Sequence, residues 1–253
     1  KTKYVYWGEV GPDSRKVNDK GPMGYDEVNQ ARTAGNFGWP FVIADNKPYP
    51  IVDFDKGTPG TLTDPAAPRN PGQRNTGLET LPPAQKAFIW YPYSESKEFP
   101  AMKTGGHNAM AGPVFYYDQS RKNNILPRED DHSLLTYDWM RGRIWKAGLD
   151  KNDRFTSLEE VAAGLRHPMD IEMAKDGSLW LLEYGSGWYF NKDGRVRHIL
   201  PSGHKPAPSI QIEATPGAPR SWQVKSTKAL VNDKITIQWW LTVGTDETML
   251  GSG

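Results

Sequence analysis

The feature that most constrains the fold of this chain is a series of short apolar and aromatic runs separated by turn-forming residues. Runs of about four to eight such residues are typical of sheet strands. They occupy residues 4–9, 40–45, 86–93, 113–118, 133–140, 142–150, 169–177, 178–185 and 195–200. The chain also contains 25 glycines and 21 prolines, which favours many turns and disfavours long helices. We therefore predict an all-β fold.

Two of the turns are specific enough to predict β-hairpins. Residues 175–177, Lys-Asp-Gly, separate two apolar runs, and residues 191–194, Asn-Lys-Asp-Gly, precede the run at 195–200. Asp-Gly sequences favour the backbone conformations that tight hairpin turns need. Successive hairpins form a meander, which is the unit of a β-propeller blade. The spacing of the strands thus predicts blades of four antiparallel strands.

Only two segments have a helical pattern. Residues 26–34 follow a potential N-cap at Asp26, and residues 157–165 begin with Ser157 and Glu160 at the spacing of a capping box. Between the strands lies a long polar connection, residues 46–85. A connection of this length either covers a functional face or only crosses between blades, and the sequence favours neither alternative.

A domain boundary is predicted near residues 201–209, where the sequence becomes rich in proline. We expect residues 1–202 to form the propeller part, and residues 203–253 to form a linker and a second β module. The strands expected in this module, residues 209–214, 221–226 and 233–243, resemble the first strands of an Ig-like or PKD-like sandwich. A sandwich of roughly seven strands needs more residues, so we expect a truncated module with a short β-sandwich-like tail.

The composition excludes several classes of protein. The 31 basic and 30 acidic residues give a net charge of +1 without long runs of like charge, so nucleic acid and anionic membranes are poor candidates as partners. The absence of cysteine excludes disulfides and Cys-ligated metals. No apolar run approaches the ~18 residues of a membrane span. The chain begins at Lys1 without a signal-peptide pattern, so we expect a mature or internal fragment.

The most characteristic segment is residues 21–40, GPMGYDEVNQARTAGNFGWP. Together with the run at 4–9, it resembles the corresponding part of the glucose/sorbosone dehydrogenase family, soluble quinoprotein sugar dehydrogenases built as six-bladed β-propellers. The resemblance extends over roughly residues 4–200 and implies a partial β-propeller, the C-terminal half with about three blades. It also implies that the N-terminal half lies elsewhere, on another chain or lost by cleavage, because an open propeller exposes strand edges and apolar blade faces.

The resemblance implies a calcium site. In the family, a Gly-Pro pair before an Asp-Glu-x-Asn segment directs two backbone carbonyls at a Ca2+ ion that also holds pyrroloquinoline quinone (PQQ), and carbonyls are suitable ligands for this hard cation. The chain has two such pairs, Gly11-Pro12 directly after the first strand and Gly21-Pro22 at the family spacing to residues 26–29. A simple turn at either pair is the alternative.

Acidic residues near these pairs are further candidates. Asp26, Glu27 and Asn29 either form hydrogen bonds around the implied ion or cap the predicted helix. Asp45 and Asn46 occupy the place at which the family often has a second, structural Ca2+ site, and an exposed turn is the alternative there.

Two segments bear on the quinone. Arg141 occupies the position of a family cation, usually Lys, that contacts PQQ, and an arginine would pair with the carboxylates of the cofactor. The alternative is a solvent-exposed arginine at the end of a strand. Trp139 and Trp145 lie nearby in the sequence and are candidates for a platform that binds a sugar. At the two positions where active members have cationic residues, this chain has His167 and Met169. Met cannot neutralise a carboxylate, which weakens the enzyme hypothesis.

The resemblance assigns the role of general base to no histidine of this chain. The family's catalytic histidine lies in early blades that precede Lys1, so no residue of this chain is expected to have its role. His107 lies in a Gly-rich segment, residues 105–117, that we predict to face the central channel. It is the candidate for a cofactor contact, and a structural role is the alternative.

Two hypotheses about function follow. In the first, the chain is part of a PQQ-dependent enzyme that oxidises an aldose and passes electrons to an acceptor such as a cytochrome. In the second, the propeller has no cofactor and binds carbohydrate or protein as a scaffold in a bacterial envelope or secreted assembly. Both imply a periplasmic, cell-surface or secreted location. The missing cationic pair favours the second, the Gly-Pro turns and Arg141 favour the first, and the fold alone does not decide.

Overall fold

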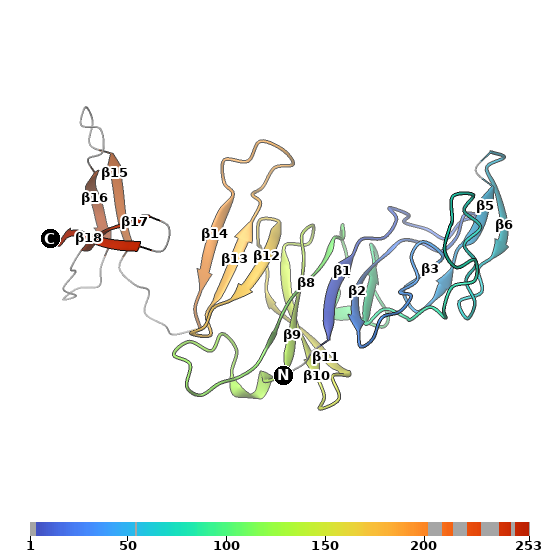
Figure 1. Cartoon of the computed structure of the whole chain (residues 1–253), viewed down its shortest axis with the longest axis horizontal. Helices are drawn as coiled ribbons and strands as arrows, with labels where there is room; N and C mark the ends of the chain where they lie inside the picture. Colours follow the sequence, from blue (N-terminus) through green and yellow to red (C-terminus); the bar gives the residue numbers. More distant parts are fainter. Residues whose placement is uncertain are drawn as a thin grey trace. The chain divides into compact units, whose positions relative to one another are not determined.

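A computed structural model describes residues 4–53 and 55–201 in full, and beyond them the backbone of strands at residues 209–214, 222–228, 238–243 and 246–252. The chain divides into two compact units, Lys1–Pro201 and Ser202–Gly253. The described residues contain two 3-10 helices, η1 (Pro100–Met102) and η2 (Arg128–Asp130), and otherwise only strands and connections (Figure 1). Neither helix is long and apolar enough to cross a membrane. The prediction of an all-β fold is confirmed.

Three antiparallel sheets form the core of the first unit. The first has the order β1 (Val5–Glu9), β2 (Tyr25–Ala31), β7 (Ile89–Pro92). The second has the order β11 (Phe155–Ala162), β10 (Arg143–Leu149), β9 (Ser133–Asp138), β8 (Ala109–Phe115). The third has the order β12 (Pro168–Met173), β13 (Leu179–Glu183), β14 (Arg195–Ile199). Each sheet is a meander, as in a propeller blade. The second sheet has the predicted four strands, and the described strands of the other two number three each.

Neighbouring sheets share hydrophobic cores, because strand β9 of the second sheet is buried on both faces. Leu134 on β9 belongs to a core that includes Val28 of the first sheet. The next residue, Leu135, belongs to a second core that includes Ile171 of the third sheet. Successive side chains of a strand point to opposite faces, and each buried side chain of this size contributes roughly 1.5–3 kcal/mol. The second sheet therefore holds the other two together.

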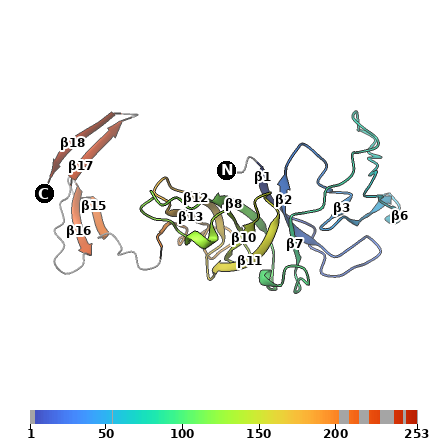
Figure 2. The same cartoon turned by 90° about the horizontal axis from the view of Figure 1, so that it is seen from below.

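The first strands of the three sheets approach each other closely. Strand β8 lies between β1 and β12 in two perpendicular views (Figures 1 and 2) and contacts both. A Cβ atom added to Gly8 on β1 would lie 1.9 Å from the carbonyl oxygen of Ala109 on β8. Only glycine permits this approach. The arrangement corresponds to the inner strands of a partial propeller.

The predicted strands and the first predicted hairpin are confirmed. Each apolar run predicted within residues 4–200 overlaps a strand, although β8 begins before the run at 113–118 and β12 before the run at 169–177. Residues 175–177 connect β12 to β13, and Gly177 has a φ of 88° while its backbone N–H donates to the carbonyl of Ala174 at 3.0 Å. A positive φ at this point is what the Asp-Gly sequence supplies. The second turn sequence, residues 191–194, lies in the connection that precedes β14.

The predicted helix at residues 26–34 is wrong. Residues 26–31 belong to β2, which pairs with β1 on one side and β7 on the other. Asp26 and Glu27 are only 0% and 4% exposed, so the strand is buried on both faces. A strand buried on both faces does not alternate between polar and apolar residues, and its pattern then resembles a short helix.

The predicted helix at residues 157–165 is also wrong. Residues 155–162 form β11, the outermost strand of the second sheet. Helix-forming glutamates are tolerated here because each faces a cation on β10: Glu159 pairs with Lys146, and Glu160 pairs with Arg143. Cross-strand ion pairs of this kind support an exposed strand.

The long connection at residues 46–85 carries structure of its own. Strand β3 (Val42–Ile43) pairs with β4 (Lys47–Pro48), and β5 (Pro50–Asp53) pairs with β6 (Thr58–Leu62). Figure 1 shows β5 and β6 as a separate hairpin beyond β3. The chain then returns to the first sheet through β7. The connection is thus an insertion between β2 and β7 with two small hairpins.

The second unit contains two further antiparallel pairs. Strand β15 (Ser209–Ala214) pairs with β16 (Trp222–Lys228), and β17 (Gln238–Val243) pairs with β18 (Asp246–Ser252). Strand β17 covers residues 238–243 of the strand predicted at 233–243, while residues 233–237 and most of the predicted linker lie outside the described residues. The Ig-like or PKD-like identity of this unit stays a prediction.

Candidate functional site

One end of the three sheets surrounds an open pocket of about 740 Å3. Its walls come from the loops after β1, β7, β9 and β13, and from the starts of β8 and β12. We call it the aromatic pocket and define it by Asp13, Arg15, Tyr93, Trp139, Met169, Tyr184 and Trp188. Each sheet therefore supplies part of the site, as the loops at one face of a propeller do. A hollow of similar size near Phe88 and Phe155 contains no predicted site residue.

Trp139 is the centre of the aromatic wall. Its ring stacks on the imidazole of His167, with 3.9 Å between ring centres and 18° between planes. The ring of Trp188 lies 5.0 Å from it, and that of Tyr184 lies 5.9 Å away. The Nδ1 atom of His167 lies 2.6 Å from the carbonyl oxygen of Gly185, which fixes the imidazole. His167 thus supports the aromatic surface.

Asp26 and His107 lie beneath the pocket. The carboxylate of Asp26 accepts hydrogen bonds from the backbone N–H groups of Gly11 at 3.0 Å and Ala109 at 2.8 Å. The Nδ1 atom of His107 lies 2.6 Å from the same carboxylate, although outside hydrogen-bond geometry. The ring of Tyr93 covers the buried imidazole at 4.0 Å. His107 is nevertheless among the residues that line the aromatic pocket, so the structure places this predicted site residue at the pocket with its imidazole buried.

The two Gly-Pro pairs lie in different surroundings. Gly11-Pro12 follows β1, is held by Asp26, and forms a tight turn in which the N–H of Ser14 donates to the Pro12 carbonyl at 2.8 Å. A carbonyl oxygen has two lone pairs, so this turn retains acceptors that fit a hard cation such as Ca2+. Gly21 and Pro22 instead border a separate hollow beside β4 and β6.

The other metal candidates are not brought together with them. The carboxylate of Asp45 is partly exposed and forms an ion pair with Lys47. Across residues 4–53 and 55–201, no group of three or more His, Cys, Asp or Glu side chains converges as a metal site. A cation at Gly11-Pro12 would therefore depend on backbone carbonyls and a ligand.

The side chain of Arg141 forms hydrogen bonds within the protein. Its guanidinium donates to five backbone carbonyls, those of Pro92, Met102, Lys103, Gly105 and Gly106, at 2.6 to 3.4 Å. An arginine side chain has five N–H donors, so all of them are accounted for. The guanidinium also lies 4.5 Å from the centre of the Tyr91 ring. Arg141 thus clamps the connection between β7 and β8, and its predicted contact with PQQ would require breaking this clamp.

A buried carboxylate supports the same clamp. Asp138 at the end of β9 accepts hydrogen bonds from the hydroxyl of Tyr91 at 2.7 Å and from the backbone N–H groups of Asn108 and Arg141. Burial raises the pKa of Asp138 above its ordinary value of 3.8, and these hydrogen bonds oppose the rise. Trp145, the other predicted platform residue, is 0% exposed and belongs to the first core.

Glu27 has the most unusual environment of the acidic side chains. It faces away from Asp26 on β2, accepts a hydrogen bond from the N–H of Ala44, and shares the amide of Asn29 with Glu9 at 3.1 Å each. Burial raises the pKa of Glu27 to about 7. A buried carboxyl with this pKa titrates near neutral pH, although it lies outside the aromatic pocket.

The pocket offers little charge for an anionic cofactor. Among the described residues that line it, Arg15 is the single Lys or Arg, and it lies 4.5 Å over the ring of Tyr93. Asp13 at the same rim accepts a hydrogen bond from the Tyr93 hydroxyl, which raises the pKa of Tyr93 to about 12. The carboxylates of PQQ require several cations, so the residues present do not fit the quinone.

Of the residues that define the pocket, sequence analysis identified Trp139 and Met169 and missed five, namely Asp13, Arg15, Tyr93, Tyr184 and Trp188. A signal was present: Trp188 begins a run of three aromatic residues, 188–190, between Gly-Ser-Gly and the turn at 191–194. Such a run in a turn-rich segment cannot join a core and indicates a surface site.

Comparison with solved structures gave distant likenesses, and comparison by sequence gave none. The sequence matches no family profile and no curated protein. Among solved structures, the chain is similar to a crystal structure of glucose dehydrogenase, with 17% sequence identity and a TM-score of 0.40. The match covers 70% of this chain and 39% of that one, so the chain spans about two fifths of the length of that dehydrogenase. A likeness this distant carries no argument about activity.

Proposed function

We propose that the aromatic pocket binds a carbohydrate, and that the chain is part of a propeller that serves as a carbohydrate-binding scaffold. The observation that carries this proposal is the lining of the pocket. Aromatic rings form its walls, and its rim has one acidic and one basic side chain, Asp13 and Arg15. Such a site favours a ligand that is uncharged, has a flat apolar face and carries polar groups around its edge.

A sugar ring has these properties. Its axial C–H groups form a face that packs on the negative π-face of an aromatic ring, as on Trp139 or Trp188. Its hydroxyl groups can donate to Asp13 and accept from Arg15 at the rim. Trp139 is held in place by His167 on one side, so little ordering of the wall is needed when a ligand binds.

The second candidate is oxidation of an aldose with Ca2+-bound PQQ. The Gly11-Pro12 turn favours it, because Asp26 holds this turn beneath the pocket with acceptors that fit Ca2+. The scarcity of cations in the pocket opposes it. A calcium titration followed by thermal unfolding tests this candidate. A rise in melting temperature that Asp26→Asn removes would support it, and no rise with either protein would contradict it.

Carbohydrate binding is tested by calorimetry with a panel of aldoses. We expect binding by the unmodified chain and a loss of at least about tenfold in affinity for Trp139→Ala, because a stacked ring contributes on the order of 1 kcal/mol beyond its buried area. The matched control is Trp180→Ala, since Trp180 is 44% exposed and lies outside the pocket. No binding across the panel, or an equal loss in both variants, would contradict the proposal.

The enzyme hypothesis is tested in the same samples. Ca2+, PQQ and an artificial electron acceptor are added, and reduction of the acceptor is followed. We expect binding of sugar without turnover. Robust turnover would reject the scaffold hypothesis in favour of the dehydrogenase.

A further inference from the structure

The connection between β13 and β14 exposes three consecutive aromatic side chains. Trp188, Tyr189 and Phe190 are 63%, 83% and 102% exposed. Trp188 lines the aromatic pocket, and Tyr189 and Phe190 follow it directly in the chain outside the pocket lining. Their Cα atoms lie within about 7 Å of that of Trp188, because each residue spans at most about 3.6 Å. Large side chains this exposed mark interaction sites.

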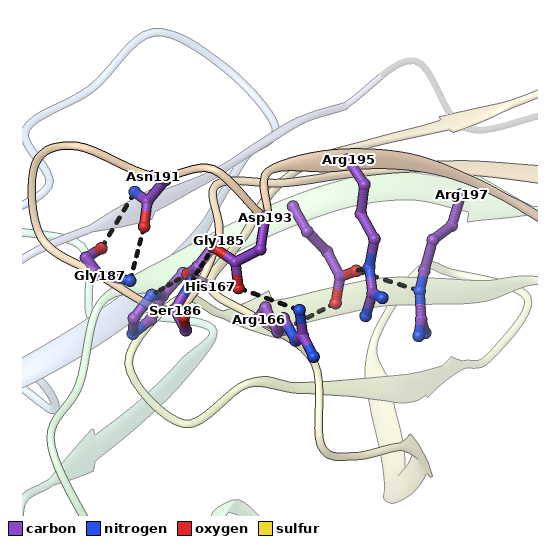
Figure 3. Close-up of polar contacts among 10 residues, drawn as sticks. Arg166, His167, Gly185, Ser186, Gly187, Asn191, Asp193, Arg195 and Arg197 are labelled. Carbon is purple, nitrogen blue, oxygen red and sulfur yellow. Dashed lines mark hydrogen bonds and ion pairs between the residues drawn. The ribbon is translucent and has the colours of Figure 1, made fainter.

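Hydrogen bonds hold this connection in a defined conformation (Figure 3). The side chain of Asn191 accepts from the N–H of Gly187 at 2.6 Å and donates to its carbonyl at 3.1 Å. The carboxylate of Asp193 accepts from the N–H of Ser186. The hydroxyl of Tyr184 donates to the carbonyl of Trp188 at 2.8 Å. The exposed rings are thus displayed on a preorganised loop, which lowers the entropy cost of binding.

Most cations at the foot of the loop are paired with carboxylates. Arg166 pairs with Asp193 at 3.0 Å, and the carboxylate of Glu183 pairs with both Arg195 and Arg197 on β14 (Figure 3). Within this connection, the structure shows no carboxylate partner for Lys192. Recognition of an anionic lipid surface uses clusters of about four to eight Lys and Arg residues, which the loop does not offer.

We propose that Tyr189 and Phe190 bind further sugar residues of a chain whose first residue occupies the aromatic pocket. The ligand class is then an oligosaccharide or polysaccharide, and a monosaccharide fills only part of the site. The proposal rests on the carbohydrate-binding function proposed above. It follows from the continuity of the exposed rings with the pocket, their preorganisation, and the pairing of the charges around them.

The test measures affinity against chain length. The probes are glucose, xylose, mannose and galactose and their β-linked series up to six sugar residues, titrated calorimetrically into the full chain. We expect affinity to rise at least about tenfold from the monosaccharide to the tetrasaccharide in one or more series. The double variant Tyr189→Ser with Phe190→Ser should lose this gain. Val196→Ser, which removes another exposed apolar side chain outside the loop, is the matched control and should keep it.

The remaining outcomes would reject either the oligosaccharide inference or the proposed carbohydrate binding as well. Monosaccharide binding without a gain from longer chains would overturn the oligosaccharide inference and leave the proposed function standing. No binding of any probe would overturn both. A loss of vesicle binding in the double variant, measured with neutral phosphatidylcholine vesicles and without any gain from sugar chains, would assign the loop to a membrane surface. If the double variant had a lower melting temperature than the unmodified chain and the Val196→Ser control, and its sugar affinities were unchanged, the two rings would be assigned to packing against protein instead of sugar.

Discussion

Replacing Arg141 by alanine tests whether its guanidinium holds the loop or serves a ligand. Three of its five hydrogen bonds, to the carbonyls of Pro92, Met102 and Gly106, are part-buried and measure 2.6, 2.8 and 2.9 Å. A hydrogen bond to a charged group contributes about 1.5–3 kcal/mol. Three bonds at the lower limit contribute about 4.5 kcal/mol. Ordering the arginine side chain opposes this with about 1.5 kcal/mol. We therefore expect a loss of about 3 kcal/mol in the free energy of unfolding.

Thermal unfolding followed by circular dichroism measures this loss. For a unit of this size, 1 kcal/mol corresponds to about 2–4 °C, so the melting temperature should fall by roughly 6–12 °C. The matched control is Arg143→Ala, whose guanidinium pairs with the partly exposed Glu160. That change should cost less than about 1 kcal/mol. Hydrogen exchange should accelerate in residues 92–106 for Arg141→Ala and stay unchanged for the control.

One result would refute the clamp. If Arg141→Ala melted within about 2 °C of the unmodified chain and lost binding of PQQ or sugar, the guanidinium would serve a ligand. The cofactor contact predicted from the sequence would then hold, and the five carbonyl contacts would be secondary.

Two further predictions concern stability. The pKa of Glu27 is raised from 4.5 to about 7, so the folded state binds more protons than the unfolded state between these values, and stability should fall as pH rises through this window, by about 3 kcal/mol in total. Glu27→Gln should flatten this dependence in urea unfolding between pH 4.5 and 8, and parallel curves would contradict the assignment. Gly8→Ala places a Cβ 1.9 Å from the carbonyl oxygen of Ala109 and should cost about 3 kcal/mol or more. Gly77→Ala, whose Cβ would meet nothing closer than 3.5 Å, should change stability by less than about 0.5 kcal/mol.

The strands were predictable because their signal is local. Apolar runs and Asp-Gly turns specify extended segments and tight reversals within a few residues, as residues 169–185 show with β12, the turn at 175–177 and β13. The two helix predictions failed for a non-local reason. The polar residues of β2 are buried because partners from β1 and β8 meet them: the carboxylate of Glu9 accepts from Asn29, and the backbone N–H of Ala109 donates to Asp26. Likewise, β11 tolerates glutamates because β10 supplies cations. Neither partner is visible in the local sequence.

The site was predictable only in part for the same reason. Trp139 could be identified from its neighbourhood, and the approach of His107 to Asp26 joins residues that are far apart in the sequence. The role of Arg141 depends on carbonyl groups of residues 92–106, and backbone carbonyls carry no sequence signal at all. A cationic side chain identified by position is therefore a weak indication of an anionic ligand until its partners are known.

The charged side chains of a binding site that have no partner within the protein determine which ligands the site can bind. In this chain Arg15 is the arginine among the described residues that line the pocket, and three further arginines are engaged within the protein: Arg141 by backbone carbonyls, Arg166 by Asp193, and Arg195 by Glu183. Each engagement stabilises a loop at the rim and also removes a cation from any carboxylate ligand. An anionic cofactor that used these arginines would have to replace contacts that they already make within the protein. A neutral sugar makes no such demand, because it needs the aromatic faces that these same contacts keep in place.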